Sequence, residues 1–101
     1  MEFMKKKILV ACGTAIATAT IVTEKLKDIL ARNKIDAEII KCRVPEVPYY
    51  IRMLGKVDLI LTTSFVPDVK NIPILNAVPL ISGLGREELE REIVKALREE
   101  N

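Results

Sequence analysis

The segment between residues 8 and 26, ILVACGTAIATATIVTEKL, constrains the fold more than any other part of this sequence. It begins with branched apolar residues that are typical of a fully buried strand, which we place at residues 6–11. From about Thr18 the apolar residues recur every three or four positions, as they do in an amphipathic helix. Cys12 therefore stands at the junction where a buried strand ends and the chain turns toward a helix.

The rest of the chain continues to alternate between strand and helix patterns. After the first helix, which ends at Asn33-Lys34, we predict a strand at 37–42, a short helix at 49–54 ended by Gly55, and a strand at 57–62. A loop is predicted at 66–76, with a short extended segment at 72–75. A fourth strand at 78–81, followed by Ser82-Gly83, and a last helix from about Arg86 complete the prediction. This alternation predicts an α/β fold: a doubly wound, four-stranded parallel sheet with helices on both faces, in three αβα layers.

The simplest strand order for such a sheet is 2-1-3-4. In this order the chain reverses direction beside the first strand, so the loop that Cys12 begins opens at the carboxyl edge of the sheet. Ligands of doubly wound sheets bind in the crevice at that edge. The sequence therefore predicts a functional site at Cys12.

Composition limits the protein class. The chain has 101 residues, 50% of them hydrophobic, which suits one domain with one layered core, residues 1–101. Met1-Glu2-Phe3, ahead of a second methionine, is interpreted as a cloning remnant or an upstream start and is left out of the fold prediction. A net charge of +2 and 4% aromatic residues do not indicate a nucleic-acid binder.

No apolar run is long enough to span a bilayer, and the chain does not start with a signal-peptide pattern. We therefore expect a cytoplasmic protein whose two cysteines are reduced, which argues against a disulfide between Cys12 and Cys42. The sequence also has no histidine. This excludes Ser-His-Asp and Cys-His catalysis within the chain and any histidine-ligated metal, so no metal site is expected.

The loop CGTAIATAT, residues 12–20, has the residue types of an anion site. Gly13, Ala15 and Ala17 keep bulky side chains away, so backbone N–H groups can converge on an anion at the positive end of the helix. Thr14, Thr18 and Thr20 add hydroxyl donors, and the same dipoles stabilise a thiolate. The alternative interpretation is packing, because cysteine is among the most buried residue types.

Known phosphate-loop patterns do not match this loop. A Walker loop needs Gly-Lys-Ser/Thr, a dinucleotide fingerprint needs three spaced glycines, and a C-x5-R phosphatase needs arginine where this chain has Thr18. The loop thus has a nucleophile and a cradle without the guanidinium that holds a phosphoryl group during hydrolysis. It is better suited to holding a phosphoryl group for transfer.

Other residues at the carboxyl edge are weaker candidates. Arg43 follows the second strand and could face a phosphorylated cysteine, or could be an exposed strand end. Thr62, Thr63 and Ser64 follow the third strand and could donate hydrogen bonds, or could serve the turn. For Cys42, inside the second strand, packing is the favoured interpretation.

Together, the pattern A-C-G-x-A-x-A-T-x-T after a strand, KCRVPEV, TTSFV and IPILNAVPLISGLG resemble the enzyme IIB subunits of the bacterial phosphoenolpyruvate-dependent sugar phosphotransferase system (PTS), most closely those of galactitol type. The resemblance covers nearly the whole chain from Met4. It implies that Cys12 accepts a phosphoryl group from a phosphohistidine of a IIA protein and delivers it to a sugar or sugar alcohol held by the membrane-embedded IIC. It implies no cofactor, and it implies that the backbone amides around the phosphate belong to Gly13, Thr14, Ala15, Ile16, Ala17 and Thr18.

Two other functions remain open at this point. A relative of the low-molecular-weight phosphatases or arsenate reductases would share the predicted fold but would turn over an aryl phosphate or arsenate alone. A non-catalytic anion-binding or regulatory module would leave Cys12 merely packed. A phosphocysteine that disappears in Cys12→Ser separates a phosphoryl carrier from the non-catalytic module, and turnover of an aryl phosphate or arsenate by the isolated chain distinguishes the phosphatase relative.

Overall fold

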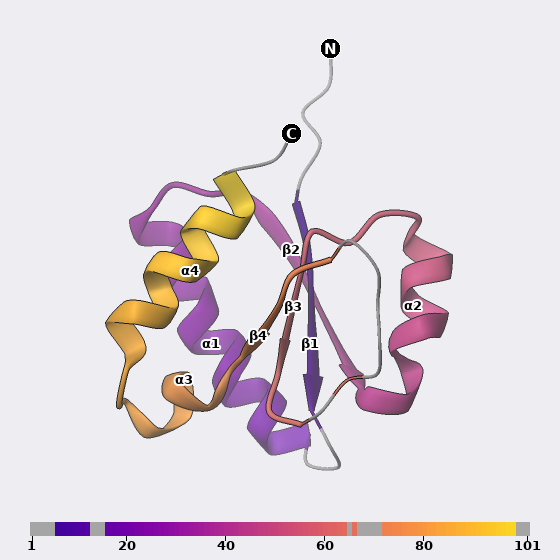
Figure 1. Ribbon diagram of the computed structural model, residues 1–101, viewed down its shortest axis with the longest axis horizontal. Coiled ribbons are helices and arrows are strands. Elements are labelled where there is room, and N and C mark those ends of the chain that lie inside the picture. Colours follow the sequence, from indigo (N-terminus) through magenta and orange to yellow (C-terminus); the bar gives the residue numbers. More distant parts are fainter. Residues whose placement is uncertain (1–5, 13–15, 65, 67–71, 99–101) are drawn as a thin grey trace.

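A computed structural model describes residues 6–12, 16–64, 66 and 72–98, with the side chains of residues 16–18 also outside the description. These residues form one parallel sheet of four strands in the order β2-β1-β3-β4, as predicted (Figure 1). The strands are β1 (Lys6–Cys12), β2 (Ala37–Arg43), β3 (Leu59–Thr62) and β4 (Ile74–Asn76).

Helices cover both faces of this sheet, which confirms the three-layer prediction (Figure 1). The helices are α1 (Ile16–Arg32), α2 (Val47–Leu54), α3 (Val78–Ser82) and α4 (Arg86–Arg98), and a short 3-10 turn, η1 (Val44–Glu46), precedes α2. Helices α1, α3 and α4 lie on one face, and of the described helices α2 lies on the other.

The central strand β1 contributes to the core on both faces. Ile8 and Val10 pack on the α1 side, whereas Leu9 and Ala11 pack on the α2 side, and all four are 0% exposed. Successive strand residues point to opposite faces, so a strand covered on both sides must be apolar throughout. This burial accounts for the continuous apolar run in the sequence.

Most predicted elements are present with small differences at their ends. Helix α1 begins at Ile16 instead of Thr18, and its end before Asn33-Lys34 is confirmed, with Lys34 at φ 56°. Strand β3 is shorter than predicted because it starts at Leu59. Helix α2 begins at Val47, with Pro48 in its first turn, where a missing backbone N–H costs nothing.

The prediction of a fourth strand at residues 78–81 is wrong. That segment is helix α3, and the fourth strand is Ile74–Asn76, which overlaps the extended segment predicted at 72–75. Pro79 lies in the first turn of α3, where proline is favoured, whereas in a strand it could not donate a ladder hydrogen bond. Gly83 ends α3 at φ 87°, a conformation that glycine adopts without strain.

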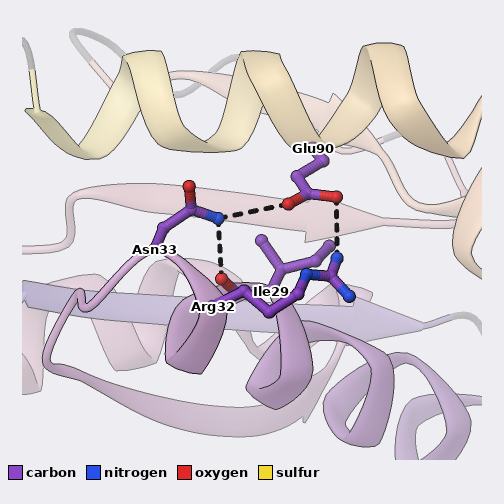
Figure 2. A network of polar contacts seen from close by, with 4 residues as sticks. All are labelled: Ile29, Arg32, Asn33 and Glu90. Carbon is purple, nitrogen blue, oxygen red and sulfur yellow. Dashed lines mark hydrogen bonds and ion pairs between the residues drawn. The ribbon is translucent and has the colours of Figure 1, made fainter.

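A polar network ties the carboxyl end of α1 to α4 across a long stretch of sequence (Figure 2). The Glu90 carboxylate accepts hydrogen bonds from Arg32 Nη2 at 2.8 Å and from Asn33 Nδ2 at 3.2 Å. Asn33 Nδ2 also donates to the carbonyl of Ile29, and Arg98 Nη2 donates to the carbonyl of Asn33, both at 2.8 Å. The network therefore connects the last helix to the first, at the end of α1 far from Cys12.

Candidate functional site

Cys12 is the last residue of β1, at the carboxyl edge of the sheet. Its side chain shares the α1 face with Ile8 and Val10, is 4% exposed, and packs in the same cluster as Ala19 and Val22 of α1. The thiol thus fills space between the strand and the start of the helix, which the packing interpretation predicted. It also lies at the edge where the first turn of α1 begins, which the anion-site interpretation requires.

The predicted phosphate loop lies largely outside the described residues. Gly13, Thr14 and Ala15 are not described, nor are the side chains of Ile16, Ala17 and Thr18. What the structure does describe is that α1 starts at Ile16, four positions after Cys12, and that Thr20 is exposed on this helix. The first N–H groups of a helix have no acceptor within it, so those of α1 are donors at the edge that carries Cys12.

Arg43 is the register partner of Cys12, across the pairing of β1 with β2. Its strand neighbours at alternate positions, Ala37 and Ile39, pack on the α1 side, so Arg43 lies on the same face as Cys12. Its Nη2 is 3.6 Å from Glu46 Oε2, and its backbone N–H donates to Glu46 Oε1 at 2.9 Å. Both side chains are exposed, and such a pair is weak enough to open.

Lys41 adds a second exposed cation on this face of β2, two positions before Arg43 and opposite Val10. Sequence analysis did not identify Lys41. The signal was available, because residues two apart on a strand point to the same face, so Lys41 and Arg43 were expected on one face. The β2 side of the Cys12 edge is therefore cationic.

Thr62 ends β3 and uses its hydroxyl within the turn that follows. Its Oγ1 donates to the Ser64 carbonyl at 2.7 Å and accepts from the Ser64 N–H at 3.0 Å. The residue is 5% exposed and pairs with Ala11. These bonds support the turn interpretation for Thr62, while half-buried Thr63 and exposed Ser64 remain at the rim.

An open depression of about 530 Å³ follows the ends of β3 and β4. It brings three of the predicted rim residues, those after β3, together with Asn76, and Arg43 is not among its lining residues. Sequence analysis did not identify Asn76, which pairs with Thr62. The Oδ1 of Asn76 accepts from the Val78 N–H at 2.9 Å and so connects β4 to α3. The available signal was an asparagine between an apolar run and Val-Pro, a turn-forming arrangement. The depression is lined by Thr62, Thr63, Ser64, Val66, Ile74, Leu75 and Asn76.

Cys42 faces the opposite side of the sheet from Cys12. It packs with Leu9 and Val47 on the α2 side, as predicted for a packing residue. Burial, then the charges of Glu46 and Cys12, raise the pKa of the Cys42 thiol to about 11. Both cysteines are free, and because their side chains leave the sheet on opposite faces, they do not meet the geometry of a disulfide.

The fold is that of the doubly wound α/β proteins, which bind their ligands at the carboxyl edge of the sheet, and Cys12 ends the inner strand β1 at that edge. Comparison with known protein families shows to which family the chain belongs. Residues 7–95 match the family described as "PTS system, Lactose/Cellobiose specific IIB subunit". The chain belongs to this family and is therefore a phosphotransferase component, a phosphoryl carrier of a sugar PTS.

Known relatives agree with this assignment. The galactitol-specific EIIB component of the PTS from Escherichia coli (strain K12) is 41% identical over 96 residues, which cover 94% of this chain and 99% of the relative. The galactitol-specific EIIB components of Escherichia coli O157:H7 and Shigella flexneri are each 40% identical over the same length and coverage. These relatives do not favour a phosphatase, and IIA and IIC components are the general partners of a IIB component. None of the described helices has the length and apolarity needed to cross a membrane.

Proposed function

We propose that Cys12 is the residue that carries the phosphoryl group, receiving it from a phosphohistidine of IIA and passing it to a sugar held by IIC on the cytoplasmic side of the membrane. We further propose that residues 1–101 work as one IIB domain. The observation that carries the proposal is the place of Cys12 at the carboxyl end of the central strand, four positions before α1, in a chain that belongs to the IIB family.

Two displacements at phosphorus make up the proposed reaction. The Cys12 thiolate attacks phosphorus, the S–P bond forms, the P–N bond of the phosphohistidine breaks, and the imidazole leaves as a neutral base once its nitrogen is protonated. A sugar hydroxyl then attacks the same phosphorus, the O–P bond forms, the S–P bond breaks, and the hydroxyl proton passes to solvent or to IIC. The thiolate is regenerated, so no cofactor is consumed.

The residues around Cys12 have roles that follow from their chemistry. The amides of residues 13–18 and the hydroxyls of Thr14, Thr18 and Thr20 hold the phosphoryl oxygens at the positive end of α1. Arg43, the register partner of Cys12, adds a positive charge when its pair with Glu46 opens. Thr63 and Ser64 contribute neutral donors from the neighbouring strand end.

The acceptor that the comparisons favour is a hexitol of galactitol type. The family description names lactose and cellobiose, but relatives that share 40–41% identity along almost the whole chain are galactitol-specific. A strain of Escherichia coli that lacks its own galactitol-specific EIIB tests this. Expression of the chain is expected to restore growth on galactitol; no growth there, with phosphorylation of lactose or cellobiose by a system containing this chain, would reverse the assignment.

The carrier proposal is tested with radioactive phosphoenolpyruvate and the general PTS proteins together with IIA. Wild-type chain and the matched control Cys42→Ser are expected to take up an acid-labile label, whereas Cys12→Ser takes up none. Equal labelling of wild type and Cys12→Ser would overturn the proposal. Turnover of an aryl phosphate or arsenate by the isolated chain would favour the phosphatase alternative instead.

A further inference from the structure

Helix α3 and the turn after it expose three large apolar side chains. Val78 and Ile81 are 42% and 43% exposed, and Leu84 is 80% exposed, whereas Leu80, on the inner side of the same helix, is buried. Residues three apart lie on the same side of a helix, so Val78 and Ile81 are neighbours. We call Val78, Ile81 and Leu84 the α3 strip. Exposed apolar residues scattered singly are ordinary, but a group of them marks an interaction site.

The α3 strip lies at the same end of the molecule as Cys12. Strand β4 ends at Asn76, whose side chain binds the Val78 N–H, so α3 starts directly at the carboxyl edge of the sheet (Figure 1). Along this edge the strand order is β2, β1 with Cys12, β3 and β4, and α3 follows β4 on the face of the sheet that carries α1. Two strand spacings, about 10 Å, separate β1 from β4, which is within the footprint of one protein partner.

The two sides of Cys12 differ in charge. On the β2 side the exposed residues Lys41 and Arg43 are cationic, and the carboxylate of Glu46, which pairs with Arg43, offsets one of these two charges. Beyond the α3 strip, the first turn of α4 carries exposed Arg86, Glu87 and Glu88, one positive and two negative charges. The edge thus has a cationic side and an apolar side bordered by carboxylates.

We propose that the α3 strip is the docking surface for the membrane-embedded IIC component. This rests on the proposed function, in which one sulfur must face two partners in succession. The cytoplasmic loops of membrane proteins are rich in Lys and Arg. Such loops are repelled by Lys41 and Arg43 and attracted to Glu87 and Glu88, which orients them over the strip. An apolar centre with a charged rim is also the usual composition of a protein interface.

The test measures the two half-reactions separately with the double variant Ile81→Ser/Leu84→Ser. Labelling of Cys12 by phosphorylated IIA is expected to match wild type. Transfer from the labelled chain to galactitol, in inverted Escherichia coli vesicles that contain the galactitol-specific IIC and no other IIB, is expected to need at least tenfold more chain for half-maximal rate. The matched control is Tyr49→Ser/Met53→Ser, which removes two exposed apolar residues from α2 on the other face and is expected to behave as wild type.

The outcomes separate this proposal from the one on which it rests. Absence of label on the wild-type chain would contradict the carrier function itself. Normal labelling with unchanged transfer would overturn the docking proposal, as would an equal loss in both half-reactions, which would assign the strip to IIA as well. A dimer in sedimentation that the double variant abolishes, with transfer unchanged, would assign the strip to a second copy of the chain.

A charge variant provides an independent check. Glu87→Gln/Glu88→Gln is expected to weaken the IIC-dependent step several-fold at low salt and to reduce its dependence on ionic strength, because the attraction to basic loops is removed. A faster IIC-dependent step in this variant would contradict the proposed orientation.

Discussion

Cys12 and Arg43 are register partners at the carboxyl ends of β1 and β2, and their side chains lie on the same face of the sheet. Neighbouring strands are about 4.8 Å apart, so the Arg43 guanidinium is within reach of a phosphoryl group carried by the Cys12 sulfur. Glu46 holds Arg43 in the structure through an exposed ion pair. We expect a dianionic phosphoryl group on Cys12, as proposed above, to compete with that carboxylate for the same guanidinium.

We therefore predict that Arg43→Gln slows phosphorylation of Cys12 by IIA about tenfold, since charge-assisted hydrogen bonds are worth roughly 1.5–3 kcal/mol. The free energy of unfolding is expected to change by less than about 1 kcal/mol, because exposed ion pairs contribute little. Rapid-quench labelling measures the rate. Glu46→Gln, which removes the competing charge and keeps an acceptor for the Arg43 N–H, is the matched control and is expected to label at least as fast as wild type; slower labelling in both variants would point to a structural role.

The two cysteines are predicted to differ in reactivity toward iodoacetamide. The raised pKa of Cys42, about 11, means that its proton is retained until high pH, so roughly one molecule in a thousand has a Cys42 thiolate at pH 8. Cys12, beside the N-terminus of α1, is expected to be alkylated first in the folded protein. Peptide mass spectrometry after alkylation at pH 6–8 gives both rates, and equal rates would argue against any activation of Cys12 by its position.

Thr23 offers a test of packing beneath α1. It is 8% exposed, and its Oγ1 is buried with no hydrogen-bond partner among the described residues. Thr23→Val replaces the hydroxyl by a methyl group of similar size and is expected to raise the free energy of unfolding by about 1 kcal/mol, because a buried unpaired polar group is costly. Urea denaturation measures the difference. Thr23→Ser keeps the hydroxyl, loses a methyl group and is expected to be less stable than wild type.

The Glu90 network predicts a loss of stability without loss of function. Glu90→Ala removes the acceptor shared by Arg32 and Asn33 (Figure 2) and is expected to lower the free energy of unfolding by about 1 kcal/mol. Labelling of Cys12 is expected to be unchanged, because the network lies at the opposite end of α1. Glu92→Ala, an exposed carboxylate of the same helix, is the control and is expected to have little effect on stability.

Local sequence patterns predicted much of the fold. The run at residues 8–11 predicted a strand buried on both faces, because only such a strand is apolar at every position. The helical spacing from Val22 to Leu30 predicted the face of α1 that packs, and Asn33-Lys34 predicted its end. The position of Cys12 at the strand end followed from the same patterns.

The fourth strand shows what local patterns do not decide. Residues 74–76 and 78–81 are both short and apolar, and such runs do not distinguish a strand from a helix. Pairing with β3 selects Ile74–Asn76 for the sheet, and Pro79 favours the helix in the second run. Which of the two segments became the fourth strand therefore depended on which one lies beside the free edge of β3.

The sequence by itself determined the alternation of strands and helices, the buried central strand and the place of Cys12 at its end, because these depend on side-chain periodicity along a single element. Only the tertiary structure decided that Arg43 lies beside Cys12, that Cys42 faces the other way, and that Thr62 meets Asn76. These relationships depend on strand register. A shift of one residue moves every side chain to the opposite face, and what holds the register is packing between segments distant in the sequence.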